Sequence, residues 1–214
     1  MTTAAPEIET VYETTLQTIY SCGPTVSNCP EASTTTPVVV ASTSAPPAST
    51  SSSCPASLSS GNYQYPHLIV PVSSAYPGEA IGTEYDATIN NTVKTIYNFD
   101  IPTSYSGHPC SLVFLFPTEF ELETSSYTFS GNGVFDFTEI SPVASSSTTY
   151  NTQGAIIKDF GEVTVTPGSS IVVATFDCPA GETVAYEISS VSGTSLEYFQ
   201  DYNPSPIGLY VVEC

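Results

Sequence analysis

From Cys54 to the end of the chain, short hydrophobic runs recur about every 8–12 residues, with turn-forming segments between them. Several runs alternate apolar and polar positions, the period of two expected for β-strands, and no window keeps the period of an amphipathic helix. We therefore predict an all-β fold, an antiparallel β-sandwich of about 10–12 short strands. The runs cover residues 65–72, 82–89, 92–100, 110–116, 119–123, 133–140, 155–166 (expected to form two strands), 170–178, 183–190, 195–200 and 206–214.

The polarity of individual runs predicts their places in the sheets. CSLVFLF (110–116) and SIVVATF (170–176) are almost entirely apolar, so we expect both to be central strands that are buried on two faces. TVKTIYNFD (92–100) alternates, so we expect one of its faces to be in contact with water.

The run EFELE (119–123) places three glutamates, at 119, 121 and 123, between two apolar residues. Side chains of a strand point alternately to its two faces. We therefore predict that Phe120 and Leu122 are core residues, and that Glu119, Glu121 and Glu123 form an acidic row on the outside of the sandwich.

Composition divides the chain into three zones. Residues 1–30 are Thr-rich, and Cys22 and Cys29 flank a Gly-Pro turn; we expect them to form a disulfide, the alternative being free or intermolecular thiols. Residues 31–53 are mostly Ser, Thr, Ala and Pro, which predicts a linker with O-linked sugars or, alternatively, an unglycosylated flexible linker. Residues 54–214 form the predicted β-sandwich domain.

The few charged residues are strongly unbalanced. The chain has 21 Asp and Glu against 2 Lys and Arg, a net charge of −19. Binding to nucleic acids and to anionic lipids depends on clusters of Lys and Arg, so the composition argues against nucleic-acid and membrane partners. An acidic surface of this kind maintains solubility and suits an acidic or cation-rich medium.

The cysteine content predicts three disulfides and an oxidising compartment, because the even count lacks metal-ligand spacing. Apart from residues 22 and 29, four cysteines remain, and they allow three pairings. Antiparallel neighbours bring the start of run 110–116 to the end of run 170–178. This favours Cys110–Cys178 and leaves Cys54–Cys214 to join the two ends of the domain.

The predicted disulfides lead us to expect a secreted protein. The first residues, MTTAAPEIET, lack the apolar stretch of a signal peptide, so we expect that an export signal has been removed. No apolar run approaches the ~20 residues of a membrane-spanning helix.

Several strings occur in an order that resembles a known family. YPHLIVPVSS, TIYNFDIP, CSLVFLFP, SSYTFSG, ATFDCPAGE and YFQDYNPSPIGLYV are similar to the fungal ubiquitin-three-binding protein C-terminal domain family, over about residues 54–214. The N-terminal TVYETTLQTIYSCGPTVSNCP resembles the Thr-rich, Cys-paired segments of fungal cell-wall proteins. These resemblances imply a secreted or wall-associated β-sandwich protein and provide no active-site motif to transfer.

The sequence shows no recognisable catalytic constellation. His67 and His108 are isolated, and no G-x-S-x-G motif marks a nucleophilic serine. Two carboxylates of the acidic row, such as Glu119 and Glu121, have a spacing compatible with glycoside hydrolysis, but the chain has no Trp to hold a sugar. The row Glu119, Glu121 and Glu123 is also a candidate Ca²⁺ site, because a cation would relieve the repulsion between its carboxylates.

The tyrosine-rich stretch near the C-terminus is a candidate ligand loop. Tyr198, Tyr202 and Asn203 lie in EYFQDYNPSP, where two prolines predict an irregular loop at a sheet edge. Tyrosine can stack on a sugar ring while its hydroxyl forms a hydrogen bond. The alternative is that these tyrosines only fill the edges of the sandwich.

Asn90 is a candidate glycosylation site. It begins Asn90-Asn91-Thr92, an N-x-T sequon between two alternating runs. Such a position predicts an exposed turn, so we expect Asn90 to carry a glycan in a secreted chain.

These observations together predict a non-catalytic, structural or adhesive module of a secreted fungal cell-wall or surface glycoprotein. We expect it to bind wall polysaccharide or an extracellular protein, without a cofactor. Two alternatives stay open: a carbohydrate-active enzyme that uses strand carboxylates, and a binding module stabilised by Ca²⁺.

Overall fold

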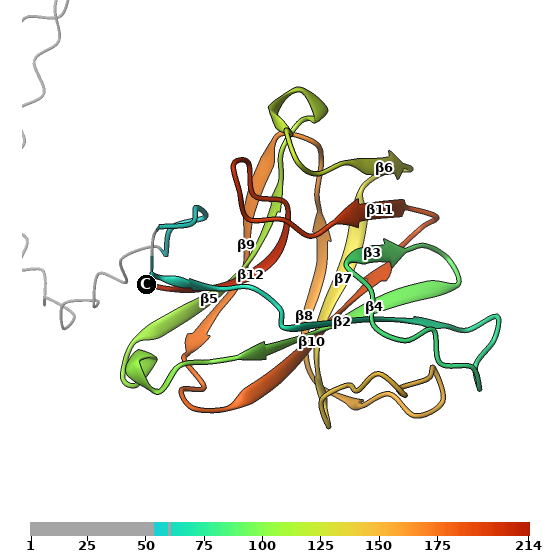
Figure 1. Cartoon of the computed structure of the whole chain (residues 1–214), viewed down its shortest axis with the longest axis horizontal. Helices are drawn as coiled ribbons and strands as arrows, with labels where there is room; N and C mark the ends of the chain where they lie inside the picture. The colour runs from blue at the N-terminus through green and yellow to red at the C-terminus, as the bar shows by residue number, and fades with distance from the viewer. Residues whose placement is uncertain (1–53, 60) are drawn as a thin grey trace, which may run out of the picture. The chain divides into compact units, whose positions relative to one another are not determined.

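The computed structural model describes residues 54–59 and 61–214. The Thr-rich segment 1–30 with the predicted Cys22–Cys29 disulfide and the linker 31–53 lie outside the described residues. The described part confirms the predicted all-β fold (Figure 1). Its strands are β1 (Tyr63–Gln64), β2 (Leu68–Ser73), β3 (Asp86–Ile89), β4 (Val93–Asp100), β5 (Pro109–Phe116), β6 (Tyr127–Ser130), β7 (Val134–Ser141), β8 (Ala155–Thr164), β9 (Ser169–Asp177), β10 (Thr183–Ser190), β11 (Ser195–Phe199) and β12 (Gly208–Glu213), and its two 3₁₀ turns are η1 (Thr103–Tyr105) and η2 (Glu119–Glu121).

The strands form three antiparallel sheets. The orders are β1-β12-β5-β9 in a four-stranded sheet, β2-β4-β10-β7-β8 in a five-stranded sheet, and β3-β11-β6 in a three-stranded sheet. The two larger sheets make the sandwich, and the smallest sheet lies along one side of it (Figure 1). No helix in the described ranges is long and apolar enough to cross a membrane.

The main core is shared by all three sheets and is rich in aromatic side chains. Tyr97 from β4 and Tyr198 from β11 are both fully enclosed, and their hydroxyls are 2.8 Å apart. Burial raises the pKa of both hydroxyls, so they remain neutral and bonded to each other. The hydrogen bond therefore joins the five-stranded sheet to the three-stranded sheet through the centre of the core.

Two further apolar clusters cover the outer faces of the larger sheets. Before β1, Ala56 and Leu58 pack with Tyr63 on the outer face of the four-stranded sheet. The loop 142–154, between β7 and β8, covers the five-stranded sheet with Ala144 and Tyr150. We call these segments the N-terminal arm (residues 54–59, 61 and 62) and the covering loop (142–154).

Each covering segment is fixed to its sheet by specific bonds. The Cys54–Cys214 disulfide ties the start of the N-terminal arm to the end of the chain. In the covering loop, the Asn98 side chain donates to the carbonyl of Ala144 at 2.7 Å and accepts from its N–H at 3.2 Å. Cys110–Cys178 joins β5 to the residue after β9, so both disulfides within the described residues are those that the sequence favoured.

Three strand predictions need correction. The run 170–176 is not central: it belongs to β9, an edge strand whose positions alternate between half-buried and exposed. The run 92–100 has no wet face along its middle, because the covering loop buries the outer side of β4. The run 155–166 forms one strand, β8, bent by two register shifts, with Gly161 at a φ of +87° that favours glycine.

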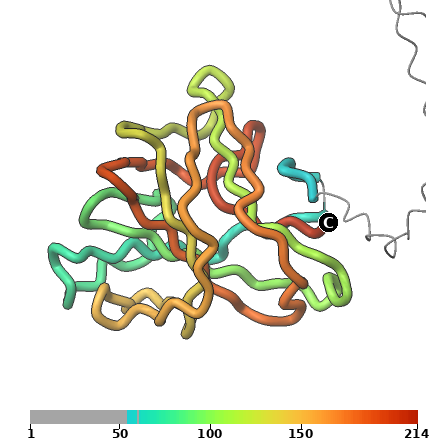
Figure 2. Tube along the Cα trace, turned by 180° about the vertical axis from the view of Figure 1, so that it is seen from behind, coloured from blue at the N-terminus to red at the C-terminus, as the bar shows by residue number. Residues whose placement is uncertain are grey.

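The edge strands β8 and β9 follow each other along one side of the sandwich (Figure 2). Lys158 of β8 lies with its ammonium 5.0 Å from the ring centre of Phe160 and 5.7 Å from that of Phe176. Lysines and bulges on an edge strand discourage pairing with another sheet. This feature of β8 therefore protects the domain against edge-to-edge association.

The Tyr97–Tyr198 pair predicts a non-additive effect on stability. Tyr198→Phe removes one hydroxyl and leaves the other buried without its partner, so we expect unfolding to require about 1–3 kcal/mol less. The double variant Tyr97→Phe/Tyr198→Phe removes both polar groups and should be close to wild type. Chemical denaturation of the three proteins checks this, and purely additive losses would contradict it.

The Cys54–Cys214 disulfide predicts a further loss of stability when it is removed. We expect Cys54→Ser/Cys214→Ser to lower the free energy of unfolding by about 2–4 kcal/mol, because an unfolded chain without this link gains conformational freedom. Guanidinium titration of the purified variant measures the loss. An unchanged denaturation midpoint would show that the N-terminal arm is held by packing alone.

Candidate ligand groove

An open groove lined by aromatic side chains lies where the chain enters β2 and leaves β11. We call it the aromatic groove; its volume is about 490 Å³. It is lined by Tyr65, Pro66, His67, Ile69, Tyr85, Phe199, Gln200, Asp201, Tyr202 and Tyr210.

One wall of the aromatic groove is a pair of stacked tyrosines. Tyr65 lies between β1 and β2, and Tyr202 lies in the loop after β11. Their ring centres are 5.9 Å apart with an interplanar angle of 13°, and the residues are 57% and 54% exposed. The half-buried Tyr63 supports the pair from β1, with its ring centre 6.4 Å from that of Tyr202.

A second aromatic pair and a buried floor complete the groove. Tyr85, which precedes β3 and is 80% exposed, has its ring centre 6.4 Å from that of Phe199 at the end of β11. Ile69 and Tyr210 are buried beneath them and contribute to the floor. Aromatic side chains therefore reach the groove from segments that are distant in the sequence.

Hydrogen bonds hold the loop 201–206 that carries Tyr202. The Tyr210 hydroxyl has one proton, which the carbonyls of Asp201 and Ile207 share as acceptors. The Thr124 hydroxyl donates to the Asp201 carboxylate at 2.6 Å. The Gln200 side chain bonds both backbone groups of Leu209 at 3.1 Å. These bonds restrain one wall of the groove before any ligand binds.

The aromatic groove has little capacity for chemistry. Its ionisable side chains besides tyrosine are Asp201 and His67, and His67 Nδ1 lies 3.1 Å from the Asp100 carboxylate. No serine, threonine or cysteine lines the groove, so this His–Asp pair has no adjacent nucleophile there. His108, the other histidine, pairs with Glu213 on an exposed turn.

The structure places the three residues of the candidate ligand loop in different environments. Tyr202 and Asn203 are exposed, as a ligand contact requires, and Tyr202 lines the groove. Tyr198 is wrong as a contact, because it is 1% exposed and bonded to Tyr97 in the core. Sequence reasoning missed Tyr65 and Tyr85, although Tyr65 precedes a proline and therefore marks a break before β2.

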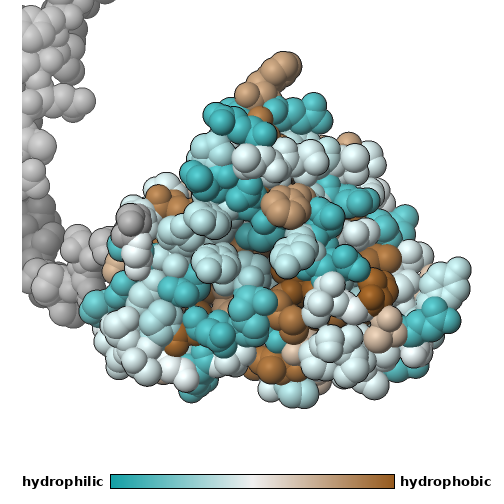
Figure 3. All heavy atoms as spheres, viewed as in Figure 1, coloured by the Kyte–Doolittle hydropathy of each residue, from teal (hydrophilic) through white to brown (hydrophobic). Residues whose placement is uncertain are grey.

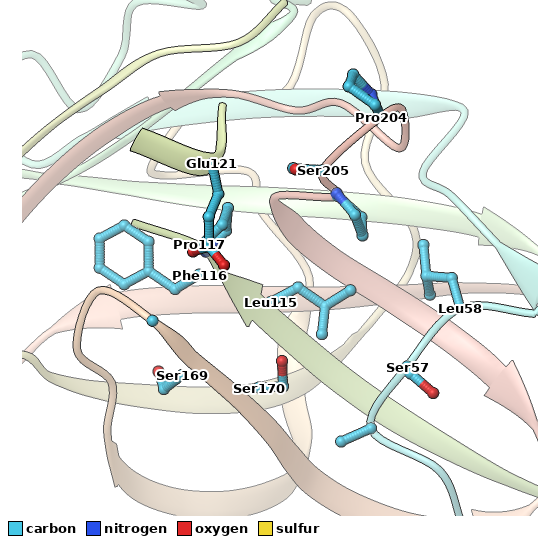
Figure 4. Close-up of a pocket in the computed structure, with 13 residues that line it drawn as sticks. Ser57, Leu58, Leu115, Phe116, Pro117, Glu121, Ser169, Ser170, Pro204 and Ser205 are labelled. Carbon is cyan, nitrogen blue, oxygen red and sulfur yellow. The ribbon is translucent and has the colours of Figure 1, made fainter. Parts of the chain in front are cut away.

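A second hollow lies beside the loop 201–206, with Pro204, Ser205 and Pro206 in its lining (Figure 4). Its volume is about 360 Å³, and Figure 4 shows Ser57 and Leu58 on one side and Pro117 and Glu121 on the other. Serines and prolines make up much of its lining, and Glu121 is its one ionisable side chain. Its aromatic lining residue, Phe116, is fully buried and offers no exposed platform, and no second ionisable group lies beside Glu121.

Comparison with known proteins identifies the family. Residues 64–204 match the model of the family described as Ubiquitin 3 binding protein But2 C-terminal domain. The chain belongs to this family. Two uncharacterized but2-like proteins of Schizosaccharomyces pombe are each 29% identical to it over 151 residues, which is 65% of this chain and 31% and 37% of the relatives. The chain thus spans about a third of the length of the curated relatives that it matches.

The acidic run of this But2 domain is not a strand. Pro117 follows β5, and residues Glu119–Glu121 form the 3₁₀ turn η2. Phe120 is 101% exposed, so the prediction that it is a core residue is wrong, whereas Leu122 is half-buried and packs on the core. The three glutamates are exposed, but on a turn rather than on a sheet face.

The reason is a local capping arrangement. The Glu121 carboxylate accepts hydrogen bonds from the Thr118 N–H at 2.8 Å and from the Thr118 hydroxyl at 2.7 Å. This capping box closes the turn and competes with the extended conformation. The same bonds hold the pKa of Glu121 below its usual value.

Phe120 has the highest exposed fraction of the large hydrophobic residues in the described part of the chain. Figure 3 shows one face of the domain, on which teal and pale groups predominate and brown groups gather over the lower part. No group of three or more His, Cys, Asp or Glu in the described residues could hold a metal ion. Glu119, Glu121 and Glu123 are not brought together into such a group.

A buried ion pair lies on the outer face of the five-stranded sheet. Lys94 of β4 donates to Glu187 of β10 at 2.8 Å, and the Glu187 residue is 3% exposed. Burial raises the pKa of Glu187, and the hydrogen bond from Lys94 opposes this shift. Burial also raises the pKa of Asp136, helped by the carboxylates of Asp159 and Glu162.

These raised pKa values predict that the domain is more stable in acid than at neutral pH. The folded state holds these protons more tightly than the unfolded chain, whose carboxyls titrate near pH 4–4.5. Stability is therefore greatest below that range and falls as the pH rises through the folded pKa values. Repulsion within a chain of net charge −19 acts in the same direction, whereas the exposed Glu121 acts weakly in the opposite direction.

Melting temperatures measured between pH 4 and pH 8 check this expectation. We expect a decrease of at least about 2 °C from pH 5 to pH 7.5, and a flatter profile for Glu187→Gln, which cannot ionise. A wild-type melting temperature that increases across this interval would contradict the prediction.

Proposed function

We propose that this But2 domain is a non-catalytic binding module of a secreted fungal wall or surface glycoprotein. The aromatic groove is its contact surface, and its ligand is an uncharged stretch of wall polysaccharide. The exposed stacked pair Tyr65–Tyr202 is the observation that carries the proposal. The domain then has a structural or adhesive role rather than a chemical one.

The chemistry of the groove supports a sugar ligand. Exposed tyrosine rings offer flat apolar surfaces with hydroxyls at their edges, a combination that matches the apolar face and peripheral hydroxyls of a pyranose ring. Tyr65 and Tyr202 form one such platform, and Tyr85 with Phe199 forms another. The groove is open, so a long chain can lie across it without threading.

The charges of the protein favour an uncharged ligand over a charged one. Lys94 forms an ion pair with Glu187, and the Lys158 ammonium lies over the rings of Phe160 and Phe176. Neither lysine lines the groove. Asp201 is the carboxylate in the lining. A polyanionic ligand would meet repulsion from a protein of net charge −19.

A carbohydrate-active enzyme has less support. Such chemistry needs one carboxyl that stays protonated near neutral pH, together with a cleft that holds the sugar. Glu119, Glu121 and Glu123 are exposed on a turn, and Thr118 stabilises the ionised form of Glu121. The groove itself has a single carboxylate lining it.

The disulfides support the extracellular location. Cys54–Cys214 links the two ends of the domain. Cys110–Cys178 links β5 to the residue after β9, in the same sheet. Such bonds persist in oxidising compartments and are rare in the cytosol. The low content of Lys and Arg and the predicted acid stability suit an acidic wall.

Binding to wall material tests the proposed function. Purified domain is mixed with insoluble β-glucan and with chitin, and the retained fraction is measured across polysaccharide concentrations. We expect Tyr65→Ala/Tyr202→Ala to weaken retention at least about tenfold, because it removes two stacking rings that each contribute on the order of 1 kcal/mol, and a tenfold change needs only about 1.4 kcal/mol. Enzymatic release of soluble sugar from either polymer would instead favour the enzyme.

Tyr76→Ala is the matched control, since Tyr76 is 64% exposed and does not line the groove. It should bind as wild type does. Absence of wild-type retention on both polymers, or equal loss in the control, would reject the groove as a polysaccharide site.

A protein partner is the second candidate function. The family description refers to ubiquitin 3 binding, and Phe120 is completely exposed between Glu119 and Glu121. This arrangement fits a partner surface with an apolar pocket and a basic rim. Titration of ubiquitin with wild type and with Phe120→Ser tests it: binding that this variant weakens would favour the protein partner over polysaccharide.

A further inference from the structure

A polar pocket lies beside the turn between β3 and β4. Its volume is about 220 Å³, of the order of a single monosaccharide unit, and it is open to solvent. The pocket is distinct from the aromatic groove. Ser74, Asn90, Asn91, Thr92, Val93, Lys94, Tyr150, Ser189 and Ser190 line it.

The side chain of Asn90 has a fixed orientation at this pocket. Its Oδ1 accepts hydrogen bonds from the N–H groups of Thr92 and Val93, at 2.9 and 3.0 Å, and from the Thr92 hydroxyl at 3.1 Å. Backbone N–H groups can only donate, so the acceptor must be the carbonyl oxygen of the amide. None of these bonds uses Nδ2, the nitrogen that N-glycosylation modifies.

The turn around Asn90 is also braced by its neighbours. The Asn90 N–H donates to the carbonyl of Val93 at 2.8 Å, which closes the turn. Ser74 donates to the carbonyl of Thr92 through both its N–H, at 2.8 Å, and its hydroxyl, at 3.1 Å. The Asn90 amide is therefore held at the pocket by a rigid backbone.

The pocket offers suitable partners for a sugar. Tyr150 of the covering loop provides an aromatic side chain, and Lys94 lies with its ammonium 5.0 Å from the ring centre of Tyr150. Ser189 and Ser190 contribute polar groups from β10. The pocket leads toward the Lys94–Glu187 ion pair, whose Lys94 side chain is 19% exposed.

We propose that Asn90 is N-glycosylated and that the first N-acetylglucosamine of the glycan occupies this pocket against Tyr150. The seated sugar covers Lys94 and bridges the β3–β4 turn to the covering loop. Modification at this position thus stabilises the domain, in addition to any effect on solubility.

Attachment of the glycan is a substitution at the anomeric carbon of its first sugar. A bond forms between Asn90 Nδ2 and the anomeric carbon of the sugar, and the bond from that carbon to the phosphate of a lipid-linked diphosphate oligosaccharide breaks. The Nδ2 nitrogen loses one proton, and the lipid diphosphate leaves. The transfer enzyme of the secretory pathway supplies the catalysis, so this domain contributes only the acceptor.

The inference rests on the extracellular location in the proposed function, because the modification takes place in the secretory pathway. The experiment avoids this dependence by forcing export. The full chain is fused to a secretion leader, expressed in a yeast host, and analysed by intact mass before and after treatment with peptide N-glycosidase.

We expect a glycan on Asn90 that is absent from Thr92→Ala, which keeps Asn90 but destroys the sequon. An unmodified wild-type chain would overturn the proposal. Because export is imposed, that result leaves the native location and the polysaccharide-retention assay unaffected.

The position of the first sugar needs a second measurement. An endoglycosidase that leaves one N-acetylglucosamine on Asn90 is compared with peptide N-glycosidase, which removes the whole glycan and converts Asn90 to Asp. We expect trimming to one sugar to leave the melting temperature unchanged, and complete removal to lower it by roughly 2–4 °C. Asn90→Asp, never glycosylated, is the matched control for the fully deglycosylated protein and should melt with it.

Tyr150→Ala distinguishes a seated sugar from a merely attached one. In this variant the single-sugar and sugar-free forms should melt at the same temperature, because the contact has been removed from both. Melting temperatures that do not respond to removal of the first sugar in wild type would overturn the seating. The same would follow if the difference between the two forms persisted in Tyr150→Ala.

Discussion

The central strands of both large sheets are buried on two faces, and this constraint shapes the rest of the domain. A sandwich buries one face of each sheet, so the outer faces need separate covers. The N-terminal arm provides one and the covering loop provides the other. Because each cover is short and crosses a sheet, it depends on the Cys54–Cys214 disulfide or on the bonds from Asn98 to Ala144.

Both candidate binding sites border these covers. The aromatic groove includes Tyr65, which directly follows β1, the strand that comes after the N-terminal arm. The polar pocket includes Tyr150, which belongs to the covering loop. Where a covering segment ends, the sheet beside it is no longer covered. Side chains at this border remain accessible to a ligand, while the backbone that carries them is fixed.

The distribution of charge adds a second constraint. With only two cations in the chain, each is used for structure: Lys94 compensates the buried Glu187, and Lys158 covers Phe160 and Phe176 between the edge strands. The binding surfaces consequently rely on aromatic rings and hydroxyl groups. This balance agrees with an uncharged ligand and with raised carboxyl pKa values on the outer face of the five-stranded sheet.

The sequence by itself determined the fold class and most strands, because strand period and turn residues are local signals. It favoured the pairings Cys110–Cys178 and Cys54–Cys214 among three possibilities, and the structure contains these two disulfides. The sequence also identified Tyr202 and Asn203 as candidate loop residues, and both are exposed in the structure. Only the tertiary structure decided that β9 is an edge, that β4 is covered, that Tyr198 is buried and that Tyr65 and Tyr85 share a groove. These outcomes depend on which distant segments meet. The turn at Glu119–Glu121 shows that even a local structure can be mispredicted from sequence. The alternation of apolar and acidic residues predicts a strand, but the hydrogen bonds between Thr118 and Glu121 close a turn instead.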